Sequence, residues 1–172
     1  MRLIRMLLVA LAAVAGTLVV TQTPALAATQ GPYELHPWGG IFWCAKVDNA
    51  NQSAPVVIRN CGTASNFYQQ WYWQDTTNGY YRIFNRQTGK CLNAAGNVTT
   101  GTRVIQYGCS TSGLNDQWKP TIKQNGDIDY YWLQNRQGGL CLRVNTSSTG
   151  NQLFTGACNQ ATWDDRWTWD RH

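Results

Sequence analysis

Ionisable side chains are scarce in this chain of 172 residues. Charged residues make up 13% of it, the only histidines are His36 and His172, and Glu34 is the single glutamate. A glycoside hydrolase needs two carboxylates that face one bond. Asp164 and Asp165 are adjacent, so on a strand they would point to opposite faces. Neither histidine has an obvious nucleophile close to it in the sequence, and we therefore expect no catalytic activity.

Basic clusters are also absent, and long apolar runs occur only near the start of the chain. The 14 Lys and Arg residues are scattered, whereas nucleic-acid-binding proteins concentrate them in a stripe, so we expect no nucleic-acid partner. The run from Met6 to Val20 follows Arg2 and Arg5. It precedes a small-residue site that ends at Ala27, which is typical of a secretory signal peptide.

A membrane anchor is the alternative interpretation of this first segment, although the run is somewhat short for a span. We expect residues 1–27 to be removed and residues 28–172 to form one secreted, extracellular domain with no membrane attachment. The segment contributes two basic residues, so the mature chain would keep 12 Lys and Arg against 9 Asp and Glu. This mild positive charge does not favour any class of partner.

Six cysteines and three tryptophans recur with nearly constant spacing. The cysteines of each pair lie 17, 18 and 17 residues apart, and a tryptophan follows the second cysteine by 10, 9 and 9 residues. The three sets are Cys44/Cys61/Trp71, Cys91/Cys109/Trp118 and Cys141/Cys158/Trp167. This periodicity predicts three internal repeats, at about residues 31–77, 78–127 and 128–172.

The repeat also predicts how the cysteines pair. Six cysteines in a secreted chain suggest three disulfides, and one bond within each repeat is the most natural of the possible pairings. The expected bonds are Cys44–Cys61, Cys91–Cys109 and Cys141–Cys158. Zinc would require clustered Cys and His ligands, which this sequence lacks, so we expect no metal and no cofactor.

Short β-rich runs alternate with Gly, Asn and Ser clusters throughout the expected domain. The runs are 56–58, Tyr80–Phe84, Val104–Tyr107, Tyr130–Leu133 and Gln152–Phe154. Asn78-Gly79 and Asn125-Gly126 each follow a repeat tryptophan by seven residues and predict tight hairpin turns. The spacing suggests about four strands per repeat, one before the first cysteine, one from it, one into the second cysteine and one through the tryptophan. Three four-stranded repeats around a pseudo-threefold axis form an all-β β-trefoil.

The motif within the repeat resembles that of ricin-B-type lectins and the related family-13 carbohydrate-binding modules, over nearly the whole expected domain. The residues that carry the resemblance are Cys91-Leu92, Cys141-Leu142 and Gln69-Gln70-Trp71. Asp116 and Asp165 replace the Gln of the Gln-x-Trp motif in the later repeats. The resemblance implies that Trp71, Trp118 and Trp167, together with Leu92 and Leu142, belong to the core.

The resemblance also implies one sugar site per repeat. Such a site has an Asp two residues after the first cysteine, an aromatic two before the second, and an Asn three before the tryptophan. These positions hold Lys46, Arg59 and Tyr68 in the first repeat, Asn93, Tyr107 and Asn115 in the second, and Arg143, Gly156 and Asp164 in the third. We expect ligand contact only at Asn93, Tyr107 and Asn115, where Asn93 keeps a carbonyl acceptor but lacks the carboxylate charge.

Two functions remain open at this point. The resemblance favours a non-catalytic, monomeric carbohydrate-binding protein whose partner is a glycan or polysaccharide. Loss of the three aspartates favours a protein-binding trefoil, such as an inhibitor or a toxin-associated subunit, that no longer binds sugar. Six further tryptophans could bind a polysaccharide outside the family's pocket, although we expect about half of them to be core. They are Trp38, Trp43, Trp73, Trp132, Trp163 and Trp169.

Overall fold

The computed structural model describes residues 27–171 except 41, 127, 146–148 and 160. The predicted signal peptide therefore lies almost wholly outside the described residues. Twelve strands run through the described part, and a single 3-10 turn at Phe67–Gln69 accompanies them. The strands are β1 (Thr29–Pro37), β2 (Trp43–Val47), β3 (Val56–Asn60), β4 (Gln70–Asp75), β5 (Tyr81–Asn85), β6 (Cys91–Ala94), β7 (Val104–Tyr107), β8 (Gln117–Asn125), β9 (Ile128–Asn135), β10 (Cys141–Arg143), β11 (Phe154–Gly156) and β12 (Trp167–Arg171).

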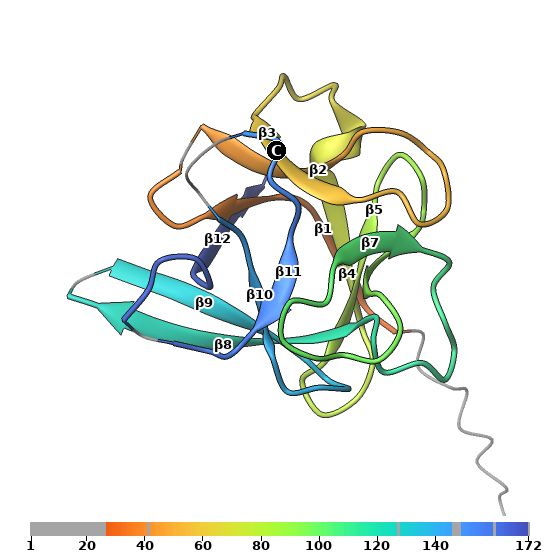
Figure 1. Ribbon diagram of the computed structural model, residues 1–172. Helices are drawn as coiled ribbons and strands as arrows, with labels where there is room; N and C mark the ends of the chain where they lie inside the picture. The colour runs from red at the N-terminus through yellow and green to blue at the C-terminus, as the bar shows by residue number, and fades with distance from the viewer. Residues whose placement is uncertain (1–26, 41, 127, 146–148, 160, 172) are drawn as a thin grey trace, which may run out of the picture.

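The first and fourth strands of the three repeats form a closed ring. Antiparallel pairing runs from β1 to β4, β5, β8, β9, β12 and back to β1. The second and third strands pair as the hairpins β2–β3, β6–β7 and β10–β11. Closure removes the free edges of a sheet, and this six-stranded barrel with three hairpins is the β-trefoil that the repeat predicts (Figure 1).

Each repeat fixes its tryptophan in the same way. Trp71, Trp118 and Trp167 are fully buried, and their Nε1–H groups donate to the carbonyl oxygen of the residue after the first cysteine, at 3.0, 2.8 and 2.9 Å. Those acceptors belong to Ala45, Leu92 and Leu142. A buried indole needs such a partner, so the strict spacing between cysteine and tryptophan reflects one contact made three times.

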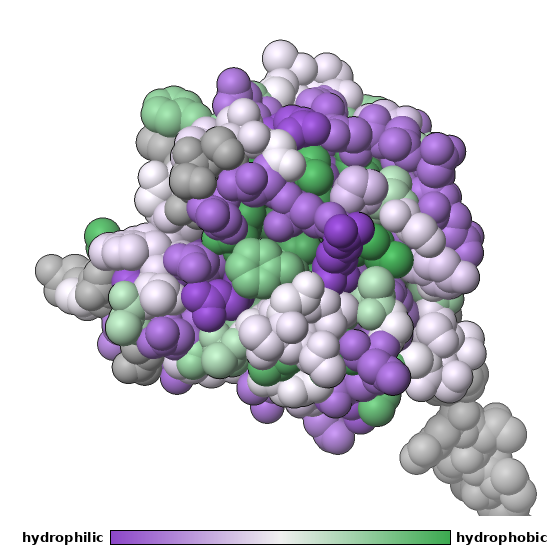
Figure 2. All heavy atoms as spheres, in the orientation of Figure 1, coloured by the Kyte–Doolittle hydropathy of each residue, from purple (hydrophilic) through white to green (hydrophobic). Residues whose placement is uncertain are grey.

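All three predicted disulfides are present: Cys44–Cys61, Cys91–Cys109 and Cys141–Cys158. Apolar residues of the barrel strands and hairpins form one core around the tryptophans, among them Leu35, Ile58, Ile83, Leu133 and Leu153. On the face drawn in Figure 2, hydrophobic residues form small patches separated by hydrophilic ones.

Two details differ from the sequence-based expectation. Asn78 and Gly79 have φ of 58° and 75° and form the predicted turn, but Asn125 still pairs with Ile128, so Asn125 belongs to the strand and the predicted turn begins after it. Residue 127 is outside the described residues. The run predicted at Gln152–Phe154 becomes a strand only at Phe154–Gly156, because Gln152 bridges to Val57 in the first repeat and Leu153 enters the core.

Candidate functional site

Strand register identifies equivalent positions in the three hairpins. In each hairpin the first cysteine pairs with the residue two before the second cysteine. The pairs are Cys44 with Arg59, Cys91 with Tyr107 and Cys141 with Gly156. Arg59, Tyr107 and Gly156 are therefore equivalent in space as well as in sequence.

In the second repeat the three predicted site residues line one pocket. Asn93 comes from β6, Tyr107 from the end of β7, and Asn115 from the loop before β8. The pocket has a volume of about 370 Å³, and its other lining residues are Ala95, Gly96, Ile105, Gly108 and Ser110. None of these lining residues carries a charge.

Hydrogen bonds hold the two asparagines at the pocket. Asn115 Nδ2 donates to Asn93 Oδ1 at 3.2 Å and to the Ala94 carbonyl at 3.1 Å, while the Ala94 amide donates to the Asn115 carbonyl at 3.0 Å. Asn93 is only 6% exposed, whereas Tyr107 is 43% exposed. An amide carries both donors and acceptors. The pocket therefore combines fixed polar groups with an accessible aromatic ring.

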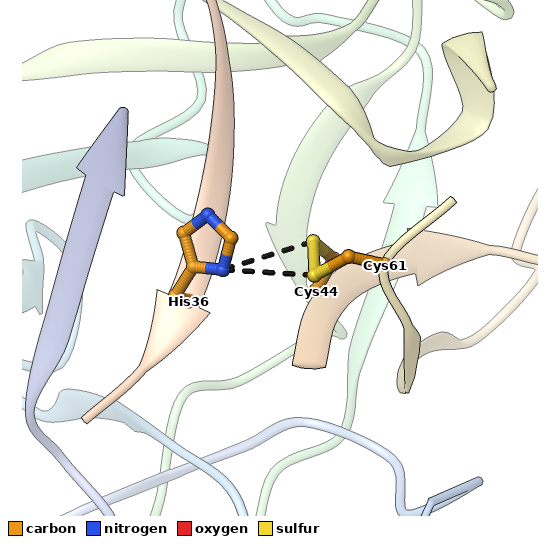
Figure 3. Close-up of side chains that lie close together, drawn as sticks. All are labelled: His36, Cys44 and Cys61. Atoms are coloured by element: carbon orange, nitrogen blue, oxygen red, sulfur yellow. Dashed lines mark hydrogen bonds between the residues drawn. A yellow bond between two sulfur atoms is a disulfide. The ribbon is translucent and has the colours of Figure 1, made fainter. Parts of the chain in front are cut away.

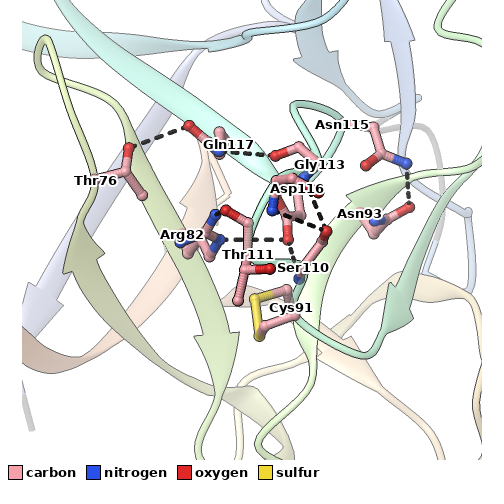
Figure 4. A network of polar contacts seen from close by, with 12 residues as sticks. Thr76, Arg82, Cys91, Asn93, Ser110, Thr111, Gly113, Asn115, Asp116 and Gln117 are labelled. Atoms are coloured by element: carbon pink, nitrogen blue, oxygen red, sulfur yellow. Dashed lines mark hydrogen bonds and ion pairs between the residues drawn. A yellow bond between two sulfur atoms is a disulfide. The ribbon is translucent and has the colours of Figure 1, made fainter.

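A buried aspartate supports the loop that carries Asn115 (Figure 4). Asp116 is fully buried, accepts a hydrogen bond from the Ser110 amide at 2.7 Å, and lies 3.5 Å from Arg82 Nε. Burial raises the pKa of the Asp116 carboxyl, and the Ser110 amide and the Arg82 guanidinium offset part of that rise. Ser110 Oγ in turn accepts from the Gly113 amide at 2.8 Å. The loop is thus organised from inside the fold.

The other repeats contain the same support. Gln69 accepts a hydrogen bond from the Gly62 amide at 2.7 Å, and Asp165 accepts one from the Asn159 amide at 2.5 Å. In all three repeats the donor is the residue directly after the second cysteine. Asp can therefore replace the Gln of Gln-x-Trp, because either side chain offers the required oxygen acceptor.

An arginine occupies the equivalent place in the third repeat. Arg143 donates to the Ala157 carbonyl at 2.9 Å, to Thr162 Oγ1 at 3.2 Å and to Asp164 Oδ2 at 2.9 Å. A Cβ added to Gly156 would lie 2.7 Å from Arg143 Cδ. The arginine side chain thus passes over the position that the aromatic ring holds in the second repeat.

Charged residues also replace the pocket in the first repeat. Arg59 forms an ion pair with Asp48, and Lys46 Nζ lies 3.8 Å from the same carboxylate. Tyr68 packs against the core. The sequence comparison already indicated that these side chains differ from the sugar-site pattern, and the structure adds that Lys46 and Arg59 both lie against the Asp48 carboxylate.

Sequence reasoning missed the other five lining residues, Ala95, Gly96, Ile105, Gly108 and Ser110. Ser110 could have been found, because it directly follows the second cysteine of the repeat. Gly96 has a φ of +65°, and nothing lies within 4 Å of a Cβ added there. Its side of the pocket is therefore open space, which spacing alone does not indicate.

The further tryptophans are divided between core and surface. Trp73 is buried, and Trp43 and Trp169 pack against the core. Trp163 is half exposed and stacks on Trp38, with ring centroids 6.0 Å apart. Half of the six thus contribute to the core, as expected.

Comparison with known proteins gives a family and a fold. The ricin-type beta-trefoil lectin domain-like family matches residues 43–107 and 67–156. No curated protein matches the sequence. Within the described residues, no helix has the length and apolarity to cross a membrane.

Solved structures with the same fold include a designed protein and parts of natural ones. The designed threefold-symmetric protein ThreeFoil is 28% identical with a TM-score of 0.70, covering 81% of this chain and 98% of its own. The exo-beta-1,3-galactanase 1,3Gal43A from Clostridium thermocellum is 26% identical with a TM-score of 0.63, covering 81% of this chain but 30% of its own.

A lectin from Polyporus squamosus, solved with the human-type influenza-binding epitope Neu5Aca2-6Galb1-4GlcNAc, is 20% identical with a TM-score of 0.68. The match covers 83% of this chain and 50% of the lectin. At this identity the likeness concerns the fold alone. The family match extends over more than half of the sequence, with the repeat, the disulfides and the buried tryptophans in agreement, and the chain belongs to the ricin-type beta-trefoil lectin domain-like family.

Proposed function

We propose that this protein is a secreted, non-catalytic carbohydrate-binding protein whose sugar site is the pocket of the second repeat. The observation that carries the proposal is the meeting of Asn93, Tyr107 and Asn115 around one open pocket. Sugar hydroxyls need oriented donors and acceptors, and the C–H face of a sugar ring packs on a flat aromatic surface. The two asparagines and the tyrosine supply these two kinds of contact.

The ligand class follows from the lining. Because no charged side chain lines the pocket, it suits a neutral sugar better than an acidic one. Its volume of about 370 Å³ is near the lower end of ordinary ligand sites. One or two sugar units would fill it, and a longer glycan would extend over the surface.

Affinity at this pocket should be weak. Asn93 stands where the family pattern has an aspartate, and a hydrogen bond to a charged group is worth roughly 1.5–3 kcal/mol. A millimolar dissociation constant corresponds to only about 4 kcal/mol. We therefore expect dissociation constants on the order of millimolar for a monosaccharide. The pocket should prefer a sugar whose binding does not require a carboxylate at the position of Asn93.

The proposed location rests on the N-terminal pattern and on the three disulfides, which persist in oxidising compartments. Sequencing the N-terminus of the exported protein tests it, and the expected first residue is Ala28. The proposal further holds that the domain acts as a monomer, which sedimentation at binding concentrations would establish.

A glycan and polysaccharide screen on residues 28–172, followed by titration of the best ligand, tests the sugar site. Tyr107→Ala and Asn93→Ala should each weaken binding at least tenfold, after circular dichroism confirms that they fold. Phe42→Ala is the matched control, because Phe42 is 75% exposed and lies outside the pocket. Unchanged binding in Tyr107→Ala would refute the site. Absence of binding to every glycan at millimolar concentration would favour a protein-binding trefoil instead.

A further inference from the structure

A histidine and two carboxylates meet where the first and last strands close the barrel. Glu34 pairs with Asp170 across the β1–β12 ladder, and His36 pairs with Thr168. Alternate residues of a strand share a face, so Glu34, His36 and Asp170 lie on one face of this ladder. Leu35 points the other way and is fully buried in the core. The three side chains are therefore on the outer face of the barrel wall.

The ligand atoms of these three side chains all lie within 4.8 Å of one another. His36 Nε2 is 2.8 Å from Asp170 Oδ1 and 4.0 Å from Glu34 Oε2. Glu34 and His36 are 4% and 8% exposed, whereas the Asp170 side chain is 72% exposed. A pocket of about 180 Å³, lined by His36, Thr168, Trp169 and Asp170, opens beside the imidazole. The cluster is thus buried on one side and open to solvent on the other.

The other ring nitrogen of His36 is fixed by the backbone. His36 Nδ1 donates to the Trp43 carbonyl at 3.1 Å and lies 3.7 Å from both sulfur atoms of the Cys44–Cys61 disulfide. Figure 3 shows this nitrogen facing the disulfide and the second nitrogen turned away from it. Metal-binding histidines commonly donate one N–H to a carbonyl in this way, which orients the other nitrogen as a ligand.

Of the three seams, the strand pairs that join successive repeats, only β1–β12 carries one histidine and two carboxylates. Strand pairing places Gln74, Arg82 and Phe84 at the equivalent positions of the β4–β5 seam, and Thr121, Trp132 and Gln134 at those of the β8–β9 seam. Neither of those sets combines an imidazole with carboxylates. The cluster is therefore an addition to the threefold pattern and not a consequence of it.

We propose that Glu34, His36 and Asp170 bind a divalent transition-metal ion of the zinc type. A neutral imidazole with two carboxylates carries a charge of −2, which a divalent ion balances, and one nitrogen with two oxygens suits zinc better than magnesium or calcium. With bonds of about 2.0–2.2 Å, ligand atoms in a tetrahedron lie roughly 3.3–3.6 Å apart. The distances of 2.8 and 4.0 Å bracket this range. The exposed Asp170 side chain can rotate to equalise them, and water completes the coordination.

The sequence argument against a metal considered only clusters of Cys and His and therefore did not examine this set. The bound ion would join β1 to β12, the strands that close the ring. Binding to the folded state alone stabilises that state by mass action, so the unfolding temperature should rise with the logarithm of the metal concentration. Sugar binding in the second repeat does not enter into this proposal.

The test uses untagged residues 28–172 with disulfides intact, freed of metal with a chelator. Calorimetric titration with zinc chloride should give one equivalent bound, and cobalt(II) should give a visible absorption spectrum typical of low coordination number. Asp170→Asn should weaken zinc binding at least tenfold and His36→Gln should abolish it. His172→Ala, which removes the only other histidine, should leave it unchanged.

Asp170→Asn keeps the test decisive if His36→Gln fails to fold, because Asp170 is an exposed position near the end of the last strand. Asp129→Asn is its matched control, since Asp129 is an exposed strand aspartate outside the cluster. Undetectable zinc binding, or equal zinc affinity in the two aspartate variants, would overturn the proposal and leave an ordinary contact between His36 and Asp170.

Discussion

The second and third repeats share one frame of supporting hydrogen bonds, but the sugar-site position is an open pocket in the second repeat and is covered by a side chain in the third. Asn85 and Asn135, at the ends of β5 and β9, each donate to backbone carbonyls of the preceding repeat, at 3.0 and 2.9 Å in their shorter bonds. Asp116 and Asp165 each accept from the residue after the second cysteine. The loops are therefore supported in the same way.

The difference lies in three side chains set on that common frame. Asn93, Tyr107 and Asn115 leave a pocket in the second repeat. In the third repeat Arg143 lies over Gly156 and pairs with Asp164. A single long side chain that meets a carboxylate and carbonyls of its own repeat is sufficient to fill the site. The comparison shows that the fold offers the position three times, while local side-chain chemistry decides whether it is open.

The largest expected effect comes from transferring the second repeat's side chains to the third. The triple variant Arg143→Asn, Gly156→Tyr, Asp164→Asn removes the covering side chain and restores a ring in strand β11. We expect the stoichiometry of sugar binding to rise from one to two sites per chain, with a loss of stability of roughly 1–2 kcal/mol from the missing ion pair and hydrogen bonds. Calorimetric titration and urea unfolding measure the two quantities.

Gly156→Tyr alone is the matched control for this transfer. A Cβ there meets Arg143 Cδ at 2.7 Å, so the single change should strain the hairpin without adding a site. If the triple variant folds and still binds one sugar per chain, then the three side chains do not explain the difference between the repeats.

The frame could be predicted from the sequence because each of its contacts recurs at fixed spacing. The Trp-to-carbonyl bond and the disulfides each link residues of one repeat, so three copies of a spacing indicate them directly. The covering role of Arg143 could not be predicted, because spacing shows that Gly156 lacks a ring but not which side chain occupies the space. Glu34, His36 and Asp170 meet only through the β1–β12 register, and His36 and Asp170 are 134 residues apart in sequence. No local pattern reports such a contact.

A smaller effect is expected from restoring the family's carboxylate in the second repeat. Asn93→Asp should strengthen binding of sugars with adjacent hydroxyls about tenfold, which is about 1.4 kcal/mol, because a charged acceptor forms stronger hydrogen bonds. Asn115 Nδ2, at 3.2 Å from the present Asn93 Oδ1, can still donate to the new carboxylate. Titration of both forms with the same sugar measures the gain, and Arg143→Asp is the control in the third repeat. Unchanged sugar affinity in Asn93→Asp would mean that Asn93 does not contact the ligand.

The smallest expected effect is a pH dependence of stability at the two buried aspartates. It tests whether the second and third repeats share one frame. Burial raises the pKa of Asp116 and of Asp165, and in each case a backbone amide and an arginine offset part of the rise. A raised pKa means that the folded protein binds the proton more readily than the unfolded chain does. Their stabilising contribution is therefore complete below the unfolded pKa of about 3.9 and declines as pH rises through the folded pKa.

Asparagine at either position keeps an oxygen that accepts from the backbone amide but carries no charge. The substitution should therefore remove the pH dependence of stability that the buried aspartate causes. The free energy of unfolding of Asp116→Asn should increase relative to that of the unmodified protein from pH 4 towards neutrality, so the variant gains relative stability, and Asp165→Asn should behave alike. Urea unfolding at several pH values measures both, with the exposed Asp129→Asn as control. Parallel curves for Asp116→Asn and the control would show that burial of Asp116 is not costly. Among the described residues, the sugar-site position is open in the second repeat and covered by Arg143 in the third. A change in sugar affinity with Asp116→Asn but not with Asp165→Asn would therefore show that the shared support serves binding in one repeat and structure in the other.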